Sequence, residues 1–133
     1  MTRQNARETM MQILYQLDVN NEFDVDKQEK YLENLDMGKQ EEYCRNILSL
    51  VCNKKKEIDE KISSNCRSWT VNRMPKTDLA VLRLAVCEIL FLDDMPNSVS
   101  INEAVELAKK YGEETSFSYI NGILGAISRS EDN

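Results

Sequence analysis

The first segment of the chain carries apolar residues at helical spacing. Between residues 3 and 19 they recur three and four positions apart, which is typical of one buried stripe on an amphipathic helix. The stripe consists of Ala6, Met10, Ile13, Leu14 and Leu17. Thr2 is a suitable N-terminal cap, and Asn20-Asn21 interrupts the pattern. We therefore predict a first helix over residues 3–19.

Two helices of different character are predicted next. Residues 24–35 hold few apolar side chains and predict a short, polar helix. After Gly38 a longer pattern begins at Lys39 and ends near Asn65. Its apolar positions are Tyr43, Ile47, Leu50, Val51, Ile58 and Ile62. Acidic residues follow the three lysines at 54–56, so we interpret this run as a solvated helix face and not as a basic binding site.

The stretch over residues 77–92 is the most apolar part of the chain. Its apolar residues surround the helix axis almost completely, and such a helix is expected to lie at the centre of a fold. Arg83 and Glu88 are its only interior charges. Thr77 or Asp78 is expected to cap its N-terminus.

Two final helices are predicted after a loop. Ser100 and Glu103 are spaced as in a capping box, so they predict the start of the first of these helices. Gly112 suits the left-handed position that follows its end. The last periodic segment has the spacing of a helix and not of a strand. Its apolar positions are Phe117, Ile120, Ile123, Leu124 and Ile127.

The dipeptide Asn121-Gly122 lies inside this last segment. Asn-Gly between apolar residues is a strong signal for a β-hairpin. The surrounding period is helical, however, so we place the dipeptide inside the helix. A glycine there costs about 1 kcal/mol relative to alanine, and we therefore expect another backbone to pack closely against Gly122. Three roles stay open for Asn121: a cap, a hydrogen bond within the core, or a contact to a ligand.

The composition supports an all-α fold of six or seven helices. The chain has 133 residues, enough for one domain with a sizeable core. It contains only four glycines and two prolines, which is few for a protein with many β-turns. No segment alternates as a strand would, and the residue 77–92 helix is expected at the centre.

The chemistry of the side chains argues against an enzyme and against a metal or other cofactor. The chain has no histidine, no nucleophile motif and no glycine-rich phosphate loop. Its four cysteines form no Cys-x-x-Cys pair, so zinc is not expected, and reduced, buried thiols in a cytoplasmic protein are the better interpretation. Acidic pairs such as Asp93-Asp94 are interpreted as solvated or capping residues. No apolar run reaches the about 18 residues that span a bilayer.

A binding surface is the more informative possibility. The net charge of −6 argues against a generally basic coat for nucleic acid, but not against a local basic patch. Arg3 and Arg7 are four apart and share one flank of the first helix, beside Gln4 and Asn5, with Tyr15 two turns beyond Arg7. Arginine, amides and an aromatic ring suit RNA. A solvated helix start explains the same residues without any ligand.

Two further aromatic residues have two possible roles each. Trp69 and Tyr119 either fill the core or anchor an interface. The residues alone therefore indicate a helical binding module of the cytoplasm whose first helix could face RNA.

Three stretches together resemble the NusB family of transcription antitermination factors. They are ARETMMQILYQLD (6–18), WTVNRMPKTDLAVLRLAVCEILF (69–91) and SVSINEAVELAKKYGEETSFSYINGILGAI (98–127). The resemblance covers nearly the whole chain and implies a single domain over residues 1–133, built from two packed three-helix bundles and without enzymatic activity or cofactor. It also implies binding of boxA RNA in ribosomal RNA leader transcripts, as a heterodimer with the ribosomal protein NusE, followed by association with elongating RNA polymerase and other Nus factors.

The resemblance assigns roles to individual residues. Gln4 and Asn5 stand where some members carry further arginines, so this chain has a less basic N-terminal segment. The implied RNA-binding residues are Arg3, Gln4, Asn5, Arg7, Tyr15, Thr115, Ser116 and Tyr119. The implied partner-binding residues are Tyr15, Arg73 and Asp78. No membrane and no small-molecule substrate are implied.

Two alternatives accompany this interpretation. The thin arginine segment and the negative net charge are compatible with a protein-only adaptor that binds NusE or polymerase without RNA. NusB-like domains also occur fused to RNA methyltransferases, but this chain shows no glycine-rich cofactor loop.

Overall fold

The computed structural model describes residues 1–67 and 71–131. Within these residues the chain forms six α-helices and no strand, which confirms the all-α fold class. The α-helices are α1 (Arg3–Asn20), α2 (Glu29–Leu32), α3 (Glu41–Ser64), α4 (Lys76–Phe91), α5 (Asn97–Tyr111) and α6 (Ser116–Glu131). Short 3-10 turns lie at Val25–Lys27, Gly38–Gln40 and Val71–Arg73.

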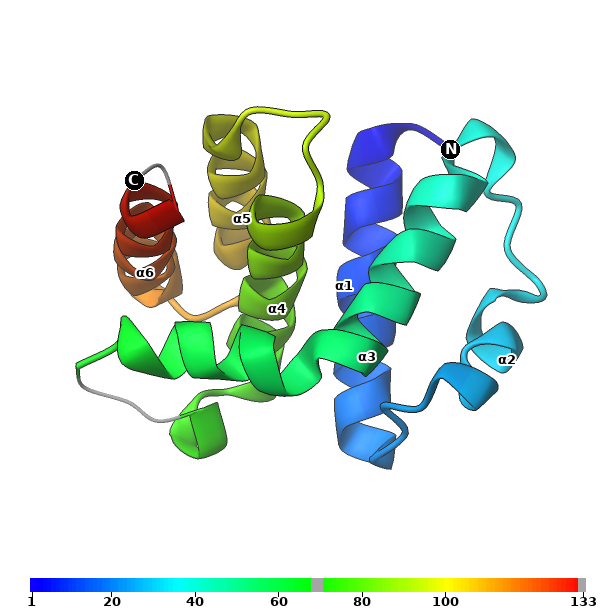
Figure 1. Ribbon diagram of the computed structural model, residues 1–133, viewed down its shortest axis with the longest axis horizontal. Coiled ribbons are helices and arrows are strands. Elements are labelled where there is room, and N and C mark those ends of the chain that lie inside the picture. Colours follow the sequence, from blue (N-terminus) through cyan, green and yellow to red (C-terminus); the bar gives the residue numbers. More distant parts are fainter. Residues whose placement is uncertain (68–70, 132–133) are drawn as a thin grey trace.

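The helices form two groups of three. Figure 1 shows α1, α2 and the first half of α3 on one side and α4, α5 and α6 on the other, with the second half of α3 extending below the second group. Helix α4 lies between the groups and packs against α1, α3, α5 and α6. Every residue from Asp78 to Ile89 is buried. The predicted central helix is therefore confirmed, and it joins the two bundles into one core.

The local signals around α1 are also confirmed. Thr2 caps the helix through a reciprocal pair of hydrogen bonds with Asn5. Asn21 ends the helix in the left-handed conformation, with φ of 53°. All five residues of the predicted apolar stripe are buried.

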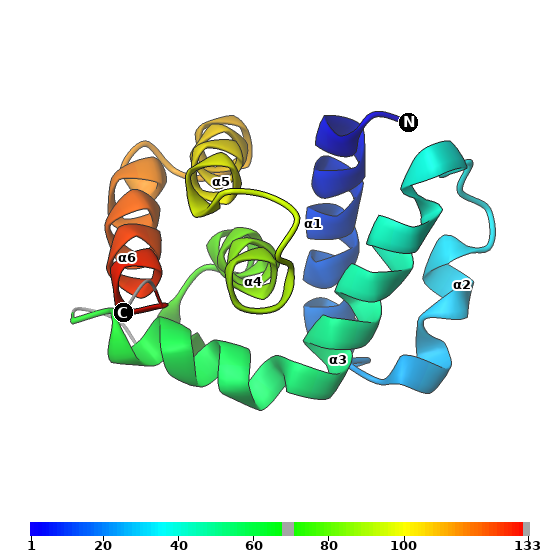
Figure 2. The same ribbon diagram turned by 45° about the horizontal axis from the view of Figure 1, so that its top comes forward.

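Helix α3 belongs to both bundles. Its first half runs beside α1, and its second half passes beneath α4 and α6 (Figure 2). The change of direction occurs at Lys54, whose φ of −116° and ψ of 17° are not helical. Lys54 and Lys56 are exposed, as expected for a solvated face.

Both interior charges of α4 are paired with partners from other helices. Arg83 donates through Nε to Asp59 of α3 at 2.9 Å and through Nη1 to Asp18 of α1 at 3.1 Å. Glu88 binds Arg7 of α1 at 2.8 Å. Buried charges are tolerated when they are paired and hydrogen-bonded, so each pair fixes α4 against the N-terminal bundle.

Two predicted helix starts are wrong. Helix α4 begins at Lys76 after Pro75, and neither Thr77 nor Asp78 caps it. Helix α5 begins at Asn97, three residues before the predicted capping box. Ser100 is buried there and donates its hydroxyl to Glu88 at 2.7 Å. A tertiary partner has thus taken the hydroxyl that the sequence pattern assigned to a cap.

The expectations for two glycines are also wrong. Gly122 lies inside α6 as predicted, but it is exposed, and a Cβ atom there would meet nothing within 4 Å. Gly112 has φ of −90° and ψ of −177°, an extended conformation and not a left-handed one. A Cβ atom on Gly112 would lie 2.7 Å from Ser116 Cβ and 2.8 Å from the Ala108 carbonyl oxygen. The closely packed glycine is therefore Gly112.

Three remaining expectations concern single side chains. Asn121 is exposed and, within the described ranges, makes no side-chain hydrogen bond, so neither a cap nor a core role applies. Trp69 lies outside the described residues. Cys44 and Cys87 are buried and Cys52 and Cys66 half-buried, all as free thiols.

Residues 1–67 and 71–131 are the part of the chain that the structure describes. No helix in that part has the length and apolar character needed to cross a membrane. No group of three or more acidic, cysteine or histidine side chains in it is arranged to hold a metal ion.

Candidate RNA and protein interface

The predicted site residues separate into two groups at opposite ends of α1. Arg3, Gln4 and Asn5 lie in its first turn, and Tyr15 lies twelve residues later, about 18 Å along the axis. The N-termini of α4 and α6 are at the same end as Tyr15 (Figure 1). Two separate surfaces must therefore be considered.

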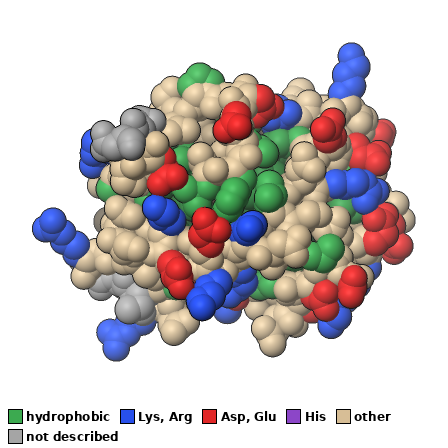
Figure 3. All heavy atoms as spheres, in the orientation of Figure 1, with side chains coloured by type: hydrophobic (Ala, Val, Ile, Leu, Met, Phe, Trp, Pro, Cys, Tyr) green, Lys and Arg blue, Asp and Glu red, His purple; other side chains and the backbone are tan. Residues whose placement is uncertain are grey.

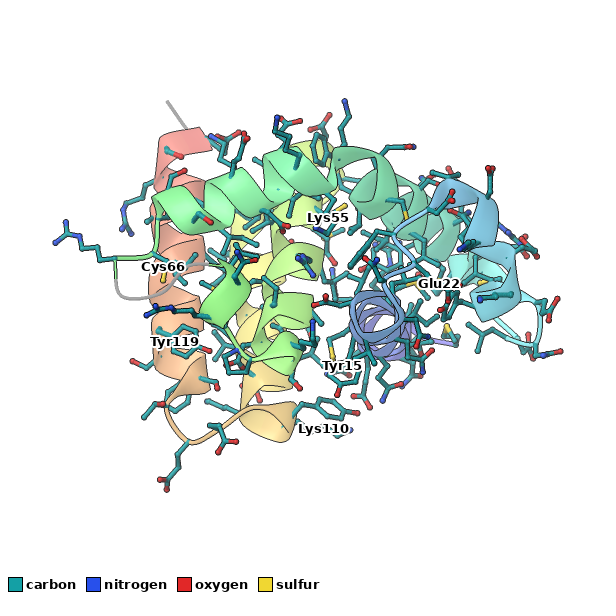
Figure 4. The ribbon with its side chains drawn as sticks, turned by 90° about the horizontal axis from the view of Figure 1, so that it is seen from below. Tyr15, Glu22, Lys55, Cys66, Lys110 and Tyr119 are labelled. Carbon is teal, nitrogen blue, oxygen red and sulfur yellow. The ribbon has the colours of Figure 1, made fainter. Side chains whose placement is uncertain are left out.

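The first surface is the lower face, which we define by Tyr15, Lys110, Thr115, Phe117 and Tyr119. Figure 4 looks at the molecule from below and shows Tyr15, Lys110 and Tyr119 at this end. Tyr15 and Phe117 are each 40% exposed. Lys109 places its ammonium group 5.3 Å from the centre of the Phe117 ring. The lower face thus combines aromatic rings with lysine side chains.

Phe117 is a residue that the sequence interpretation missed. Its spacing assigns it to the apolar face of the last helix, yet it is exposed in the first turn of α6. At the end of a helix, spacing does not predict reliably which side chains are buried. The boundary of the helix is uncertain by about one residue there, and neighbouring helices no longer cover its apolar face. The nearby Lys109-Lys110 pair was the available signal for an interface here.

Asp78 lies beneath the lower face and not on it. The side chain is 2% exposed and accepts hydrogen bonds from Ser116 Oγ, at 3.0 Å, and from the Tyr119 hydroxyl. Ser116 is also buried and accepts a hydrogen bond from the Glu113 backbone N–H at 3.0 Å. Asp78, which the resemblance implies to be a partner-binding residue, is thus buried in this chain and not open to a partner. Asp78 instead joins the start of α4 to the start of α6 and orients Tyr119.

Burial changes the titration of this carboxyl group. Desolvation raises the pKa of Asp78 above its usual 3.8, while the hydrogen bond from Ser116 acts in the opposite direction. Because the folded pKa exceeds the unfolded one, the fold favours the protonated form. The corresponding stability is present below the unfolded pKa and is lost as pH rises through the folded pKa.

We expect Asp78→Asn to remove this pH dependence. Relative to the variant, the wild type should lose free energy of unfolding as the pH rises above the ordinary pKa of an aspartate, about 4. Urea denaturation at several pH values measures the difference. Asp94→Asn, at an exposed loop position, is the control and should run parallel to the wild type. Parallel curves for Asp78→Asn would contradict the raised pKa.

Arg7 is not on the exposed flank that its spacing from Arg3 suggested. Its Nε donates to Glu88 Oε2 at 2.8 Å, and its Nη2 donates to Glu88 Oε1 at 3.2 Å. Tyr43 and Ser100 donate to the same carboxylate at 2.5 Å and 2.7 Å. Arg7 is turned inward because α4 brings a buried carboxylate that requires a counter-charge. We call Arg7, Tyr43, Glu88 and Ser100 the Glu88 cluster.

The protonation of Tyr43 is consistent with its role as a donor in this cluster. Burial raises the pKa of the Tyr43 hydroxyl above its usual value, and the negative charge of Glu88 raises it further. The phenol therefore keeps its proton and donates to the carboxylate.

The second surface is the first turn of α1. Arg3 is half-buried and donates from Nε to Gln40 Oε1 at 2.6 Å. Its guanidinium lies 4.1 Å from the centre of the Tyr43 ring. Gln4 is exposed, whereas the exposed Asn5 uses its side-chain oxygen in the cap with Thr2. Arg3 and Gln4 are thus the residues of this turn that remain open to a ligand.

The groove that connects the two surfaces is acidic. It runs between α1 and α5 and is lined by Gln4, Asn5, Arg7, Glu8, Glu103, Glu106, Leu107 and Lys110. Lys110 is paired with Glu8 at 2.9 Å, and Arg7 with Glu88. Glu106 is paired with Lys109 at 3.7 Å, so Glu103 is the carboxylate that keeps the groove negative and opposes a continuous path for phosphates along α1.

Among the residues that the structure describes, the face that carries α3 is not predominantly basic. Figure 3 shows acidic and basic side chains interspersed on the face that carries α3. Lys55 is paired there with Asp59 at 3.2 Å. Mixed charge of this kind agrees with the interpretation of residues 54–56 as a solvated face.

Comparisons with known proteins agree with this geometry. The sequence model of the NusB family matches residues 4–129. The transcription antitermination protein NusB of Finegoldia magna is 37% identical over 134 residues, which cover 100% of this chain and 98% of that protein. The T. maritima NusB structure superposes with a TM-score of 0.87 at 35% identity, covering 97% of this chain and 92% of that one.

A third comparison concerns a complex. The structure of antitermination factors NusB and NusE in complex with dsRNA contains a chain that superposes with a TM-score of 0.83. The two chains are 27% identical, and 96% of each is covered. NusB proteins are antitermination factors and not enzymes, which confirms the expectation of a non-catalytic protein. The family match and the full-length relatives establish that this chain belongs to the NusB family of transcription antitermination factors.

Proposed function

We propose that this chain binds the boxA RNA of ribosomal RNA leader transcripts as a heterodimer with NusE. The complex joins elongating RNA polymerase and other Nus factors in the cytoplasm and suppresses premature termination. Residues 1–133 act as one RNA-binding domain. A structural neighbour found with both NusE and RNA supports this proposal.

The lower face is the observation that carries the proposal. Its exposed Tyr15 and Phe117 and its half-buried Tyr119 provide ring faces on which bases can stack. Lys109 and Lys110 lie beside them in exposed ion pairs with Glu106 and Glu8, which are weak enough for a phosphate to compete with the carboxylates. Thr115 is exposed just before α6, at the positive end of the dipole of that helix. Single-stranded RNA requires this combination of rings and charge.

NusE has a specific task in this proposal. The net charge of −6 and the acidic groove weaken the attraction of this chain for phosphates. Tyr15 and the exposed Arg73 belong to the same end of the molecule and are the partner-facing residues that remain accessible, since Asp78 is buried. NusE would complete the RNA site there, so that the heterodimer binds more tightly than either protein.

We expect Tyr15→Ala to weaken boxA binding by the heterodimer about 5- to 150-fold, because stacking on an aromatic ring contributes about 1–3 kcal/mol per base. Fluorescence anisotropy with labelled boxA RNA and purified NusE measures this loss. Val25→Ala removes a similarly exposed side chain away from the lower face and should bind normally. Equal binding of boxA and a scrambled RNA by the wild-type heterodimer would contradict the proposal.

A protein-only adaptor is the second candidate. The acidic groove and the inward-turned Arg7 favour it, since both reduce the attraction for RNA. The same titration separates the candidates. An adaptor would form a complex with NusE on size-exclusion chromatography, and adding this chain would leave the RNA affinity of NusE unchanged.

A further inference from the structure

Arg3 has a guanidinium edge that is available to a ligand. Its Nε is used by Gln40, and no hydrogen bond or ion pair within the described residues engages its Nη groups. Arg7, by contrast, uses both Nε and Nη2 inside the fold. Two free Nη groups in one plane match the geometry of phosphate oxygens.

Two residues at the start of α3 hold this guanidinium in place. Gln40 accepts the Nε hydrogen bond at 2.6 Å, and the Tyr43 ring lies against the guanidinium at 4.1 Å. A free arginine side chain samples many rotamers, and a ligand must pay for ordering it. Contacts from another helix have already ordered Arg3 in the absence of a ligand.

The Tyr43 ring is itself fixed from the core. Its side chain is buried, and its hydroxyl donates to the Glu88 oxygen that also accepts from Arg7 Nε. The order of contacts is therefore Arg7 to Glu88, Glu88 to Tyr43, and Tyr43 to Arg3. The buried Arg7 thereby supports the half-buried Arg3.

The residues around Arg3 determine whether its charge is available to a phosphate. The adjoining hollow is lined by Arg3, Lys39, Glu42, Tyr43, Asn46, Phe91, Leu92, Asp93 and Asp94. Its carboxylates repel a phosphate, but among the described residues none forms an ion pair with Arg3. Arg3 therefore keeps its charge for a ligand that approaches its open edge, and a displaced Arg3 could be neutralised by Asp93 or Asp94.

We propose that Gln40 and Tyr43 are positioning residues that hold Arg3 ready to bind an RNA phosphate. The proposal rests on the RNA binding proposed above. According to this proposal, Arg3 is the arginine of α1 that contacts a phosphate, whereas the resemblance implies that Arg3 and Arg7 both bind RNA. Arg7 instead helps to position Arg3 through Glu88 and Tyr43.

A double-mutant cycle tests the proposal with the NusE heterodimer and boxA RNA. We expect Arg3→Ala to weaken binding and to reduce the slope of log K against log salt by about 0.7–0.9, the value for one lost phosphate contact. Gln40→Ala should weaken binding about 2- to 10-fold, because Arg3 must then be ordered on binding. The double variant should bind no more weakly than Arg3→Ala alone.

Two further variants separate positioning from general stability. Gln28→Ala is the matched control, because Gln28 also accepts a side-chain hydrogen bond, from Ser49 of α3, but lies far from Arg3 along the chain. It should bind RNA normally. Tyr43→Leu removes the ring and should add nothing to Arg3→Ala, with its folding confirmed by circular dichroism below its melting temperature.

The outcomes distinguish this proposal from the proposed function. Additive losses for Arg3→Ala and Gln40→Ala, or an unchanged salt slope for Arg3→Ala, would overturn the positioning role. The proposed function would survive either result if Tyr15→Ala still weakened binding. Absence of boxA binding by the wild-type heterodimer would overturn both.

Discussion

Arg7→Met is expected to lower the free energy of unfolding by about 3–5 kcal/mol, because removal of one partner leaves a buried charge uncompensated. Glu88 is 1% exposed, so water cannot replace the lost guanidinium. Tyr43 and Ser100 would still donate to the carboxylate, but neither carries a positive charge. The loss should appear as a lower urea midpoint with an unchanged slope.

A second substitution tests this explanation. The double variant Arg7→Met/Glu88→Leu replaces the ion pair by apolar side chains and should recover part of the lost stability, although the Tyr43 and Ser100 hydroxyls then lack their acceptor. Arg45→Met is the control, since Arg45 pairs with Glu29 and Glu41 on the surface and should contribute far less. Equal losses for the Arg7 and Arg45 variants would show that burial of the pair is unimportant.

Gly112→Ala and Gly122→Ala are expected to change stability in opposite directions. The new Cβ at Gly112 would be forced against Ser116 Cβ and the Ala108 carbonyl oxygen, and such overpacking costs about 1–3 kcal/mol. At Gly122 the Cβ would enter open space on a helix, where alanine is favoured over glycine by about 1 kcal/mol.

Thermal unfolding of each variant and of the wild type measures these changes in stability. The melting temperature should fall for Gly112→Ala and rise for Gly122→Ala. Because Gly112 adjoins Ser116, the first variant should also disturb the hydrogen bond to Asp78 beneath the lower face. A lower melting temperature for Gly122→Ala would restore the close-packing account that the structure contradicts.

The fold could be predicted from the sequence because burial of apolar surface dominates it. The stripe of α1 and the nearly all-apolar α4 identify which faces must be covered, and these faces define the central helix. The same reasoning predicted that Asn121-Gly122 lies inside a helix and not in a β-hairpin. In each case the pattern extends over several turns, so a single exceptional residue does not obscure it.

The site could be predicted less well because exposure of a polar residue depends on distant partners. Arg3 and Arg7 are four residues apart and are therefore expected on the same flank of α1. Only Arg7, however, contacts a buried carboxylate, that of Glu88, which lies 81 positions later in the chain. Asp78 lies two residues inside α4 and is covered by α6. Ser100 similarly gave its hydroxyl to Glu88 and not to a cap. One sequence does not reveal such pairings.

The position of Glu88 has a consequence for the order in which the chain folds during synthesis. Helices α1 to α3 leave the ribosome first, and the apolar stripe of α1 packs mainly against α4, which is made later. Until α4 has been synthesised, Arg7 lacks its counter-ion Glu88. The apolar stripe of α1 then also lacks the helix that covers most of it. The N-terminal bundle is therefore not an independent folding unit, and a nascent chain that ends before α4 offers an exposed apolar surface to chaperones.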